Sequence, residues 1–330
     1  MKINNRDSYF DNLKGFLIIA VIVGNSLEVA NPKYVNIHFL ILLLYVFHMP
    51  LFAFVSGYFS KLSTRTVKEK VNDTIKLYFY SQMFYTAFNF FILGRDDVSL
   101  KLLMPQWTLW YLLSLVCWHM IEDYIKEHKK WIIFTIALAI LVGFDASIGT
   151  NGSVSRTLFF LPFFIAGNAF KLEYISILKL NRIKILIVSI ITLGALWVLS
   201  QETPVELFFE YSKYTWYFDS PWFPMYMRMF HYFAAVFVGM TILIYIPKKK
   251  TVLDKLGRYS LILYLVHSGV AQILIGYKLL KYDSLLDVII STIIIVIVVV
   301  IISFSWVMIK KRMKASHFNP FLKSVGAMIT

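Results

Sequence analysis

Residues 285–310 read LLDVIISTIIIVIVVVIISFSWVMIK, a stretch in which Asp287 and Lys310 are the only charged side chains. At a rise of about 1.5 Å per residue, a helix of this length crosses the hydrocarbon core of a bilayer, which is roughly 30 Å thick. An uninterrupted apolar run this long is not typical of a helix in a soluble domain. It therefore predicts a membrane-spanning helix.

Nine further apolar segments extend this pattern along the whole chain. Open strands would leave backbone groups unpaired in lipid, so each segment is expected to be helical. The ten predicted spans are residues 12–31, 38–58, 77–94, 107–124, 130–146, 157–170, 182–201, 226–247, 259–279 and 285–310. We therefore expect an all-α polytopic bundle of about ten transmembrane helices, forming one domain over residues 1–330 in the lipid bilayer.

The composition excludes several other classes of protein. Hydrophobic residues make up 58% of the chain and charged residues 16%, which is too little charge for an ordinary soluble domain. The net charge of +14 does not indicate nucleic-acid binding, because the basic residues lie in short runs between apolar segments. A single cysteine, Cys117, excludes an intramolecular disulfide, and no Cys/His cluster has the spacing of a metal site.

The basic residues also predict the orientation of the bundle. If the N-terminus is cytoplasmic, 25 of the 33 Lys and Arg residues fall in cytoplasmic segments and eight fall outside. This asymmetry follows the positive-inside rule and indicates an even number of spans. We expect a multi-pass protein of the cell (plasma) membrane with both termini cytoplasmic, and a first segment that is a permanent span rather than a cleaved signal.

Polar side chains inside predicted spans are costly and are therefore functional candidates. Lys14 and Asn25 are eleven residues apart, which places them on one helix face about 16 Å apart. His48 lies in mid-span beside Pro50, a residue that commonly bends a helix where a cavity is lined. For each of these side chains, an anchoring role or an interhelical hydrogen bond stays open beside a catalytic one.

Later segments add further candidates. Ser260, Tyr264 and His267 form a polar stripe at helical spacing in an otherwise apolar segment. Arg228 lies near the outer start of its span, where it could either contact a substrate or anchor the helix at the membrane interface. Trp110 allows the same two interpretations. The longest connection, about residues 201–225, is either an interfacial belt or a surface that stacks on sugar rings. This connection is rich in aromatic residues, which include Phe208, Phe209, Tyr211, Tyr214, Trp216, Tyr217, Phe218 and Trp222.

Five short motifs, taken in order and nearly end to end, resemble the membrane acyltransferase-3 family, in particular its fucose 4-O-acetylase-like branch. The motifs are Arg6, Asp11, Lys14 and Gly15 before an apolar run to Gly24-Asn25; Phe47-His48-Met49-Pro50-Leu51-Phe52 with Ser56-Gly57; Leu109-Trp110-Tyr111-Leu112; Leu161-Pro162-Phe163-Phe164 with Gly167; and Leu256-Gly257 with Ser260, Tyr264 and His267.

The resemblance implies transfer of an acyl group, usually acetyl, from cytoplasmic acetyl-CoA to a hydroxyl of a cell-surface saccharide or its lipid-linked precursor. Acetyl-CoA is then a co-substrate, and no bound cofactor is implied. The phosphates of CoA need cationic side chains at the inner mouth. The residues expected to bind substrates are Lys14, with Lys70 or Lys76, for the donor, and Trp110, Tyr264 and Arg228 for the acceptor.

The chain departs from the family pattern at Asn25, which stands where the first-helix histidine is expected. An amide cannot accept a proton at neutral pH, although it can donate a hydrogen bond to the thioester oxygen. The base role then passes to His48, with His267 as second choice, and the three side chains should converge on one cavity open to the cytoplasm. Loss of the histidine also motivates an alternative, a non-catalytic partner in export of a surface polysaccharide. A secondary transporter is weaker, because Glu28 is the only acidic residue deep in a predicted span.

Overall fold

The computed structural model describes residues 8–28, 35–96, 98–145 and 151–315, and within these ranges the regular structure is entirely helical. Each of the ten predicted segments contains a helix. These are α1 (Ser8–Leu27), α2 (Val35–Leu62), α3 (Val67–Phe91), α4 (Trp110–Ile121), α5 (His128–Val142), α6 (Val154–Ala169), α8 (Arg182–Leu199), α9 (Trp222–Tyr245), α11 (Ser260–Gly276) and α12 (Leu285–Ala315). Residues 29–31 and 146 of the predicted spans, and Lys2, Arg6 and Lys323, lie outside the described residues.

Two short helices were not predicted. They are α7 (Tyr174–Leu180), which follows α6 at a bend of 103°, and α10 (Val252–Arg258), which precedes α11 at a bend of 81°. Both lie in basic connections between apolar segments, where hydropathy alone gives no helix signal.

The start of α3 also differs from the prediction, which placed it at residue 77 instead of Val67. The earlier start has a local cause. The Thr66 side chain accepts a hydrogen bond from the Glu69 backbone N–H, and the Glu69 carboxylate accepts one from the Thr66 backbone N–H. This capping box begins the helix before the apolar segment does.

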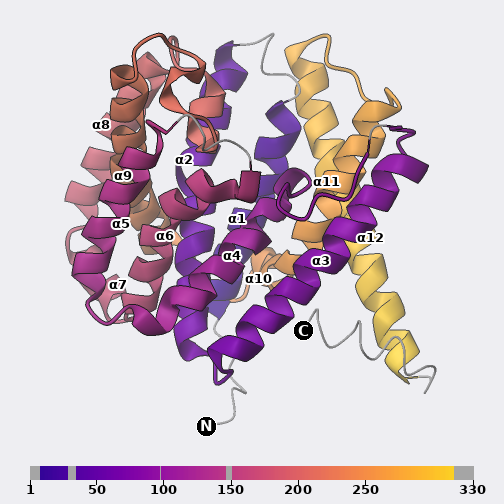
Figure 1. Cartoon of the computed structure of the whole chain (residues 1–330), viewed down its shortest axis with the longest axis horizontal. Helices are drawn as coiled ribbons and strands as arrows, with labels where there is room; N and C mark the ends of the chain where they lie inside the picture. The colour runs from indigo at the N-terminus through magenta and orange to yellow at the C-terminus, as the bar shows by residue number, and fades with distance from the viewer. Residues whose placement is uncertain (1–7, 29–34, 97, 146–150, 316–330) are drawn as a thin grey trace.

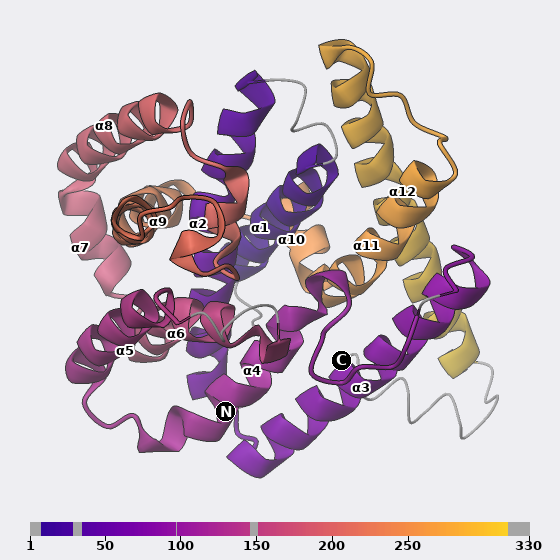
Figure 2. The ribbon, with the colours of Figure 1, turned by 45° about the horizontal axis from the view of Figure 1, so that its top comes forward.

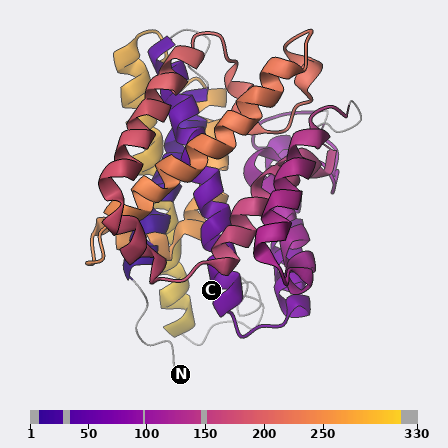
Figure 3. The ribbon, with the colours of Figure 1, turned by 90° about the vertical axis from the view of Figure 1, so that its left-hand side faces the viewer.

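Successive long helices run in opposite directions, and α1 begins at the same end of the bundle at which α12 ends (Figures 1 and 3). This shared end agrees with an even number of crossings. Figure 2 shows α1 and α2 near the centre, with α8 and α9 on one side and α11 and α12 on the other. The two central helices pack on each other, α1 also on α11 and α12, and α2 also on α9.

The predicted helical membrane bundle is confirmed. Within the described residues, five helices are long and apolar enough to cross a bilayer, namely α1, α2, α8, α9 and α12. Two more crossings result if the bent pairs α6–α7 and α10–α11 each count as one span. The remaining helices fall short of this measure, α4 and α5 because they have 12 and 15 residues, and α3 because of its polar side chains. The number of ten crossings stays a prediction.

The closest packing of α1 is against the short helix α10, and it depends on two glycines. A β-carbon added at Gly15 would lie 2.0 Å from the carbonyl oxygen of Leu253, and one added at Gly257 would lie 1.7 Å from that of Asp11. The two backbones are therefore in direct contact, as small residues permit between membrane helices.

The contact between α2 and α6 is built in the same way. A β-carbon at Gly57 would lie 1.9 Å from the Phe164 carbonyl oxygen, and one at Gly167 would lie 1.8 Å from the Phe54 carbonyl oxygen. Each helix places one glycine against the backbone of the other helix. A shift of either helix along the other would therefore bring larger side chains into this contact. These two contacts fix α1 and α2, which carry most of the polar candidates, against their neighbours.

The α2–α6 contact gives a stability prediction. Gly167→Ala places a methyl group against the backbone carbonyl of Phe54, which cannot move aside by a change of side-chain rotamer. Overpacking of this kind costs about 2 kcal/mol or more. We expect lower thermal stability in detergent, measured by the temperature at which half of the protein remains monodisperse.

Gly194→Ala in α8 is the matched control, because a β-carbon there meets nothing within 4 Å. The better helix propensity of alanine should leave its thermal stability unchanged or slightly higher. Equal midpoints for the two variants would contradict the close-contact argument.

Candidate active site

A cavity of about 240 Å³ lies at the end of the bundle where α1 and α11 end and where α4 and α6 begin. Aromatic side chains form much of its wall and alternate with polar ones. The lining residues are Asn25, Glu28, Tyr45, Met49, Trp107, Thr108, Trp110, Arg156, Phe160, Phe208, Phe209, Ser268, Ala271, Gln272 and Ile275. If the N-terminus is cytoplasmic, this end of the bundle is the outer one, whereas the sequence predicted an opening toward the cytoplasm.

Asn25 lines this cavity, and His267 lies directly behind it. The Asn25 amide nitrogen lies 3.0 Å from His267 Nε2, and His267 Nδ1 lies 2.6 Å from the backbone carbonyl oxygen of Tyr264. Because a carbonyl only accepts hydrogen bonds, Nδ1 carries the proton and a neutral ring keeps its lone pair on Nε2. Helices α1 and α11 thus hold an imidazole lone pair against the amide of Asn25.

Tyr45 of α2 joins the same group. Its hydroxyl donates to the Asn25 side-chain oxygen at 3.0 Å and makes a very short contact with the Glu28 carboxylate. His48 packs edge-on against the Tyr45 ring at a centroid distance of 4.6 Å, and its Nδ1 faces the Leu44 carbonyl oxygen at 2.6 Å. The structure therefore brings Asn25 and His267 into contact, and it places each histidine behind a lining residue, His267 behind Asn25 and His48 behind Tyr45.

Two hydroxyl groups complete the polar wall beside His267. Ser268 Oγ lies 3.3 Å from His267 Nε2 and 2.9 Å from Thr108 Oγ1. Tyr264 donates its hydroxyl to the backbone carbonyl of Thr108, so it fixes the turn before α4 to α11. Of the predicted acceptor-binding residues, Tyr264 supports the wall, while Trp110 lines the cavity itself.

Arg156 is the one basic side chain among the residues that line this cavity. Its guanidinium lies between two rings, 4.8 Å from the centroid of Trp110 and 4.9 Å from that of Tyr211. Nε donates to the Phe209 carbonyl oxygen at 2.9 Å. The outer connection therefore closes over the cavity through both its backbone and its aromatic residues.

The predicted donor-binding lysines lie far from this cavity, at the other end of the bundle. Lys14 forms an ion pair with Asp11 at 2.8 Å, and its ammonium lies 5.0 Å from the centroid of the Phe59 ring. Lys76 is exposed on α3. For these two residues the phosphate contact stays a prediction.

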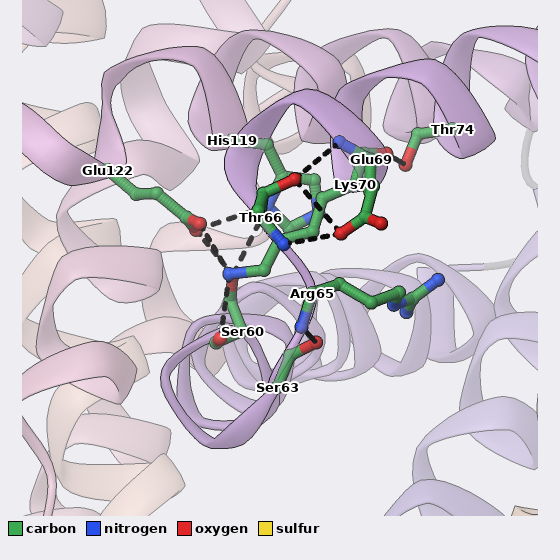
Figure 4. A network of polar contacts seen from close by, with 9 residues as sticks. All are labelled: Ser60, Ser63, Arg65, Thr66, Glu69, Lys70, Thr74, His119 and Glu122. Carbon is green, nitrogen blue, oxygen red and sulfur yellow. Dashed lines mark hydrogen bonds and ion pairs between the residues drawn. The ribbon is translucent and has the colours of Figure 1, made fainter.

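Lys70 has a different set of partners (Figure 4). Its ammonium donates to the Ser60 carbonyl at 2.9 Å, to the Ser60 hydroxyl at 3.1 Å and to the Glu122 carboxylate at 2.5 Å. His119 Nδ1 and the Ser60 hydroxyl also contact this carboxylate. The three N–H donors of Lys70 are thus used within a buried network that joins α2, α3 and the end of α4.

Arg228 is likewise paired inside the protein. Its Nε lies 2.6 Å from the Glu210 carboxylate, one terminal nitrogen donates to the Ala139 carbonyl at 2.9 Å, and the other approaches the Ser155 hydroxyl at 3.2 Å. His231 Nδ1 contacts the same carboxylate at 2.8 Å. Of the two interpretations from sequence, the structure therefore favours an anchor, which ties the outer connection to α9.

Comparison with known proteins agrees with this architecture. Residues 7–308 match the acyltransferase-3 family model, which is described as an acyltransferase domain. The chain belongs to the acyltransferase-3 family. Nodulation protein NolL of Sinorhizobium fredii is 31% identical over 185 residues, which is 51% of this chain and 49% of the relative. NolL of Mesorhizobium japonicum is 28% identical over 155 residues, 42% of this chain and 41% of the relative.

The chain thus spans about half the length of the curated relatives it matches. No solved structure matches it. Several acyltransferase-3 motif positions have clear structural roles. Gly15, Gly57, Gly167 and Gly257 make the two backbone contacts between helices. Tyr111 of the Leu-Trp-Tyr-Leu element exchanges a hydrogen bond with Ser56 of α2 at 2.7 Å.

Sequence reasoning missed Arg156 and Tyr45, and it noted Glu28 only as an isolated acidic residue. One signal pointed to Arg156, which is among the eight basic residues on the sparsely charged outer side. Nothing in the sequence placed it between Trp110 and Tyr211, because those residues come from two other parts of the chain. Within the described residues, no group of three His, Cys, Asp or Glu side chains could hold a metal ion.

A variant of Lys70 tests whether this residue stabilises the fold or binds a substrate. Lys70→Ala leaves the Glu122 carboxylate buried without its cation, and breaking a buried pair costs about 3 kcal/mol. We expect a clear loss of thermal stability. If acetyl-CoA is the donor, as the sequence predicts, its affinity for the folded fraction should equal its affinity for the wild type, measured by calorimetry on the purified protein.

Lys76→Ala on the exposed face of α3 is the matched control for stability and should unfold as the wild type does. A large drop in acetyl-CoA affinity for Lys70→Ala with unchanged stability would instead restore the phosphate contact predicted from the sequence.

Proposed function

We propose that this protein is a membrane O-acyltransferase that moves an acyl group, in the first instance acetyl, from cytoplasmic acyl-CoA to a hydroxyl of a cell-surface saccharide or its lipid-linked precursor. The observation that carries the proposal is the Nε2 lone pair of His267, held against Asn25 and Ser268, which line an aromatic and polar cavity. A positioned base next to a space for a hydroxyl compound is what O-acyl transfer needs. Membership of the acyltransferase-3 family supports the same reaction class.

In the proposed reaction the acceptor hydroxyl displaces the Asn25 N–H from His267 Nε2, attacks the thioester carbonyl and gives its proton to Nε2, directly or through the Ser268 hydroxyl. The carbon–sulfur bond then breaks, and the leaving thiolate takes the proton from the imidazolium. The products are the O-acyl ester and free CoA thiol. The Tyr264 carbonyl holds His267 Nδ1–H throughout, so Nε2 alone exchanges the proton.

Asn25 supplies the complementary electrostatic role. Its amide nitrogen carries two N–H groups, of which one points at His267 Nε2, so the other is left for the oxyanion that forms on the thioester. Tyr45 donates to the Asn25 side-chain oxygen and thereby fixes which end of the amide faces the base. An asparagine at this position is therefore compatible with catalysis when the base lies on α11.

The donor enters from the opposite end of the bundle in this proposal. Lys14 and Asn25 lie on the same face of α1, about 16 Å apart along the helix axis. A thioester on an extended arm is therefore needed to connect a phosphate site near Lys14 with the cavity. The pantetheine arm of CoA is such an extended, narrow group. The acyl group, rather than the whole acyl-CoA, then reaches the outer half of the bundle.

A pair of variants distinguishes between the two candidate bases, His267 and His48. His267→Ala should lower acetyl transfer at least 100-fold, because general-base catalysis is worth about 10²–10⁴. His48→Ala should retain most of the activity, since Tyr45 lies between His48 and the cavity. The measurement is incorporation of label from [¹⁴C]acetyl-CoA into glycan in membranes that contain equal amounts of each variant.

His128→Ala is the control for histidine loss, because His128 contacts Asn168 at 3.0 Å near the other end of the bundle. If His48→Ala abolished incorporation while His267→Ala left it intact, the base assigned from the sequence would replace the one proposed here.

One observation favours a second candidate function, assistance in export of a surface polysaccharide without catalysis. Asn25 occupies the position of the expected histidine and covers the Nε2 lone pair of His267. In such a protein, deletion blocks export of the glycan while acetylation of retained polymer continues.

Variants at Asn25 discriminate between the two functions. Asn25→Asp keeps the shape of the side chain but removes both N–H donors, so an enzyme should lose roughly 100-fold in kcat. Asn25→His is the companion variant, and a large gain of acetyl transfer there would show that the native residue impairs catalysis. The same labelled-acetate assay reads both variants, and an unchanged rate in Asn25→Asp contradicts the oxyanion role.

A further inference from the structure

We propose that the cavity binds one uncharged sugar ring of the acceptor, with Glu28 and Arg156 as the side chains that recognise its hydroxyl groups. This inference rests on the proposed function, because it specifies which saccharide the acyl group reaches. It concerns two residues that the reaction itself does not use. They come from the end of α1 and the first turn of α6, so only the fold brings them to one wall.

The size of the cavity limits the ligand. Its volume of about 240 Å³ equals that of roughly eight water molecules at about 30 Å³ each. A single sugar ring fills such a space, whereas a second ring has to remain outside. The ligand is therefore a terminal or exposed sugar unit, with the rest of the glycan or lipid carrier extending out of the cavity.

The walls suit a sugar rather than an aliphatic group. Trp107, Phe160 and Phe209 are among the aromatic residues that line the cavity, and sugar rings pack their C–H bonds against aromatic side chains. Between them, Gln272 and the hydroxyls described above offer hydrogen-bond donors and acceptors. A pocket with aromatic walls and a few polar groups fixes both the plane and the orientation of a polyhydroxylated ring.

Arg156 has donors to spare for such a ligand. Its Nε bonds to the Phe209 carbonyl, and its plane is held between Trp110 and Tyr211, so the orientation of the guanidinium is set before any ligand binds. The remaining four N–H groups lie on its two terminal nitrogens. A preorganised guanidinium of this kind loses little entropy when it bonds to a pair of neighbouring hydroxyls.

Glu28 supplies an acidic side chain in the same cavity. The Tyr45 hydroxyl contacts its carboxyl group, and the Arg156 guanidinium lines the cavity with it. The lining residues thus include one acidic and one basic side chain. An anionic sugar would bring a second acidic group beside the Glu28 carboxyl group, whereas a neutral sugar would not.

The experiment uses matched pairs of methyl glycosides and methyl glycosiduronic acids of gluco, galacto and manno configuration. Binding to the purified full-length protein in detergent is measured by saturation-transfer NMR, which does not depend on turnover. For at least one configuration, the wild type should bind the neutral member about tenfold more tightly than its acidic partner.

Charge variants then test the two residues separately. Glu28→Gln leaves the arginine unbalanced and should shift the neutral-to-acidic preference at least tenfold toward the acidic sugar. Arg156→Gln should weaken the neutral sugar about tenfold without any gain for the acidic one. Arg65→Gln and Glu127→Gln are the controls, because both residues belong to exposed ion pairs and should bind as the wild type does.

Three results would overturn the proposal. They are equal binding of neutral and acidic members by the wild type, no detectable binding of any neutral glycoside, and an unchanged preference in Glu28→Gln. Neutral-sugar binding with the expected shifts but no acetyl transfer would leave this inference standing and remove the proposed enzymatic function instead.

Discussion

Direct backbone contact at two pairs of glycines is the constraint on which the arrangement of this protein depends. In lipid there is no hydrophobic driving force between apolar helices, so close packing has to supply the attraction. Gly15 and Gly257 bring α10 onto α1, while Gly57 and Gly167 bring α6 onto α2. The two central helices are thereby held in fixed register with their neighbours, and the side chains farther along them meet at one place.

That place is the cavity near the ends of α1 and α11. Polar groups buried in a membrane protein need partners, because no water replaces a missing hydrogen bond. Here the requirement produces a chain of contacts from Tyr45 through Asn25 to His267, which crosses from α2 to α1 to α11. The same chain orients the amide, and the Tyr264 carbonyl at the end of it fixes the tautomer of the imidazole. The hydrogen bonds that give these buried polar groups their partners thus also position the groups proposed to act in catalysis.

The two ends of the bundle differ in character. At the end where α1 begins, several charged side chains are paired in compact clusters, such as Lys70 with Glu122 and Arg258 with Asp254. At the other end, aromatic rings surround a few polar groups, and Arg156 lies between rings of α4 and the outer connection. The proposed reaction, with a soluble donor at one end and a bulky acceptor at the other, is consistent with such a difference.

The sequence by itself determined the all-helical membrane bundle and the ten segments that contain its main helices, because long apolar runs in lipid have no alternative to helix. It also singled out Asn25, His48 and His267, since polar side chains in such runs are rare. Only the tertiary structure decided that His267 meets Asn25 while His48 lies behind Tyr45, and that Arg156 and Glu28 share a cavity. Those pairings join segments far apart in the chain. Hydropathy and helical periodicity describe each helix by itself, and they do not give the rotation or the depth at which one helix packs against another.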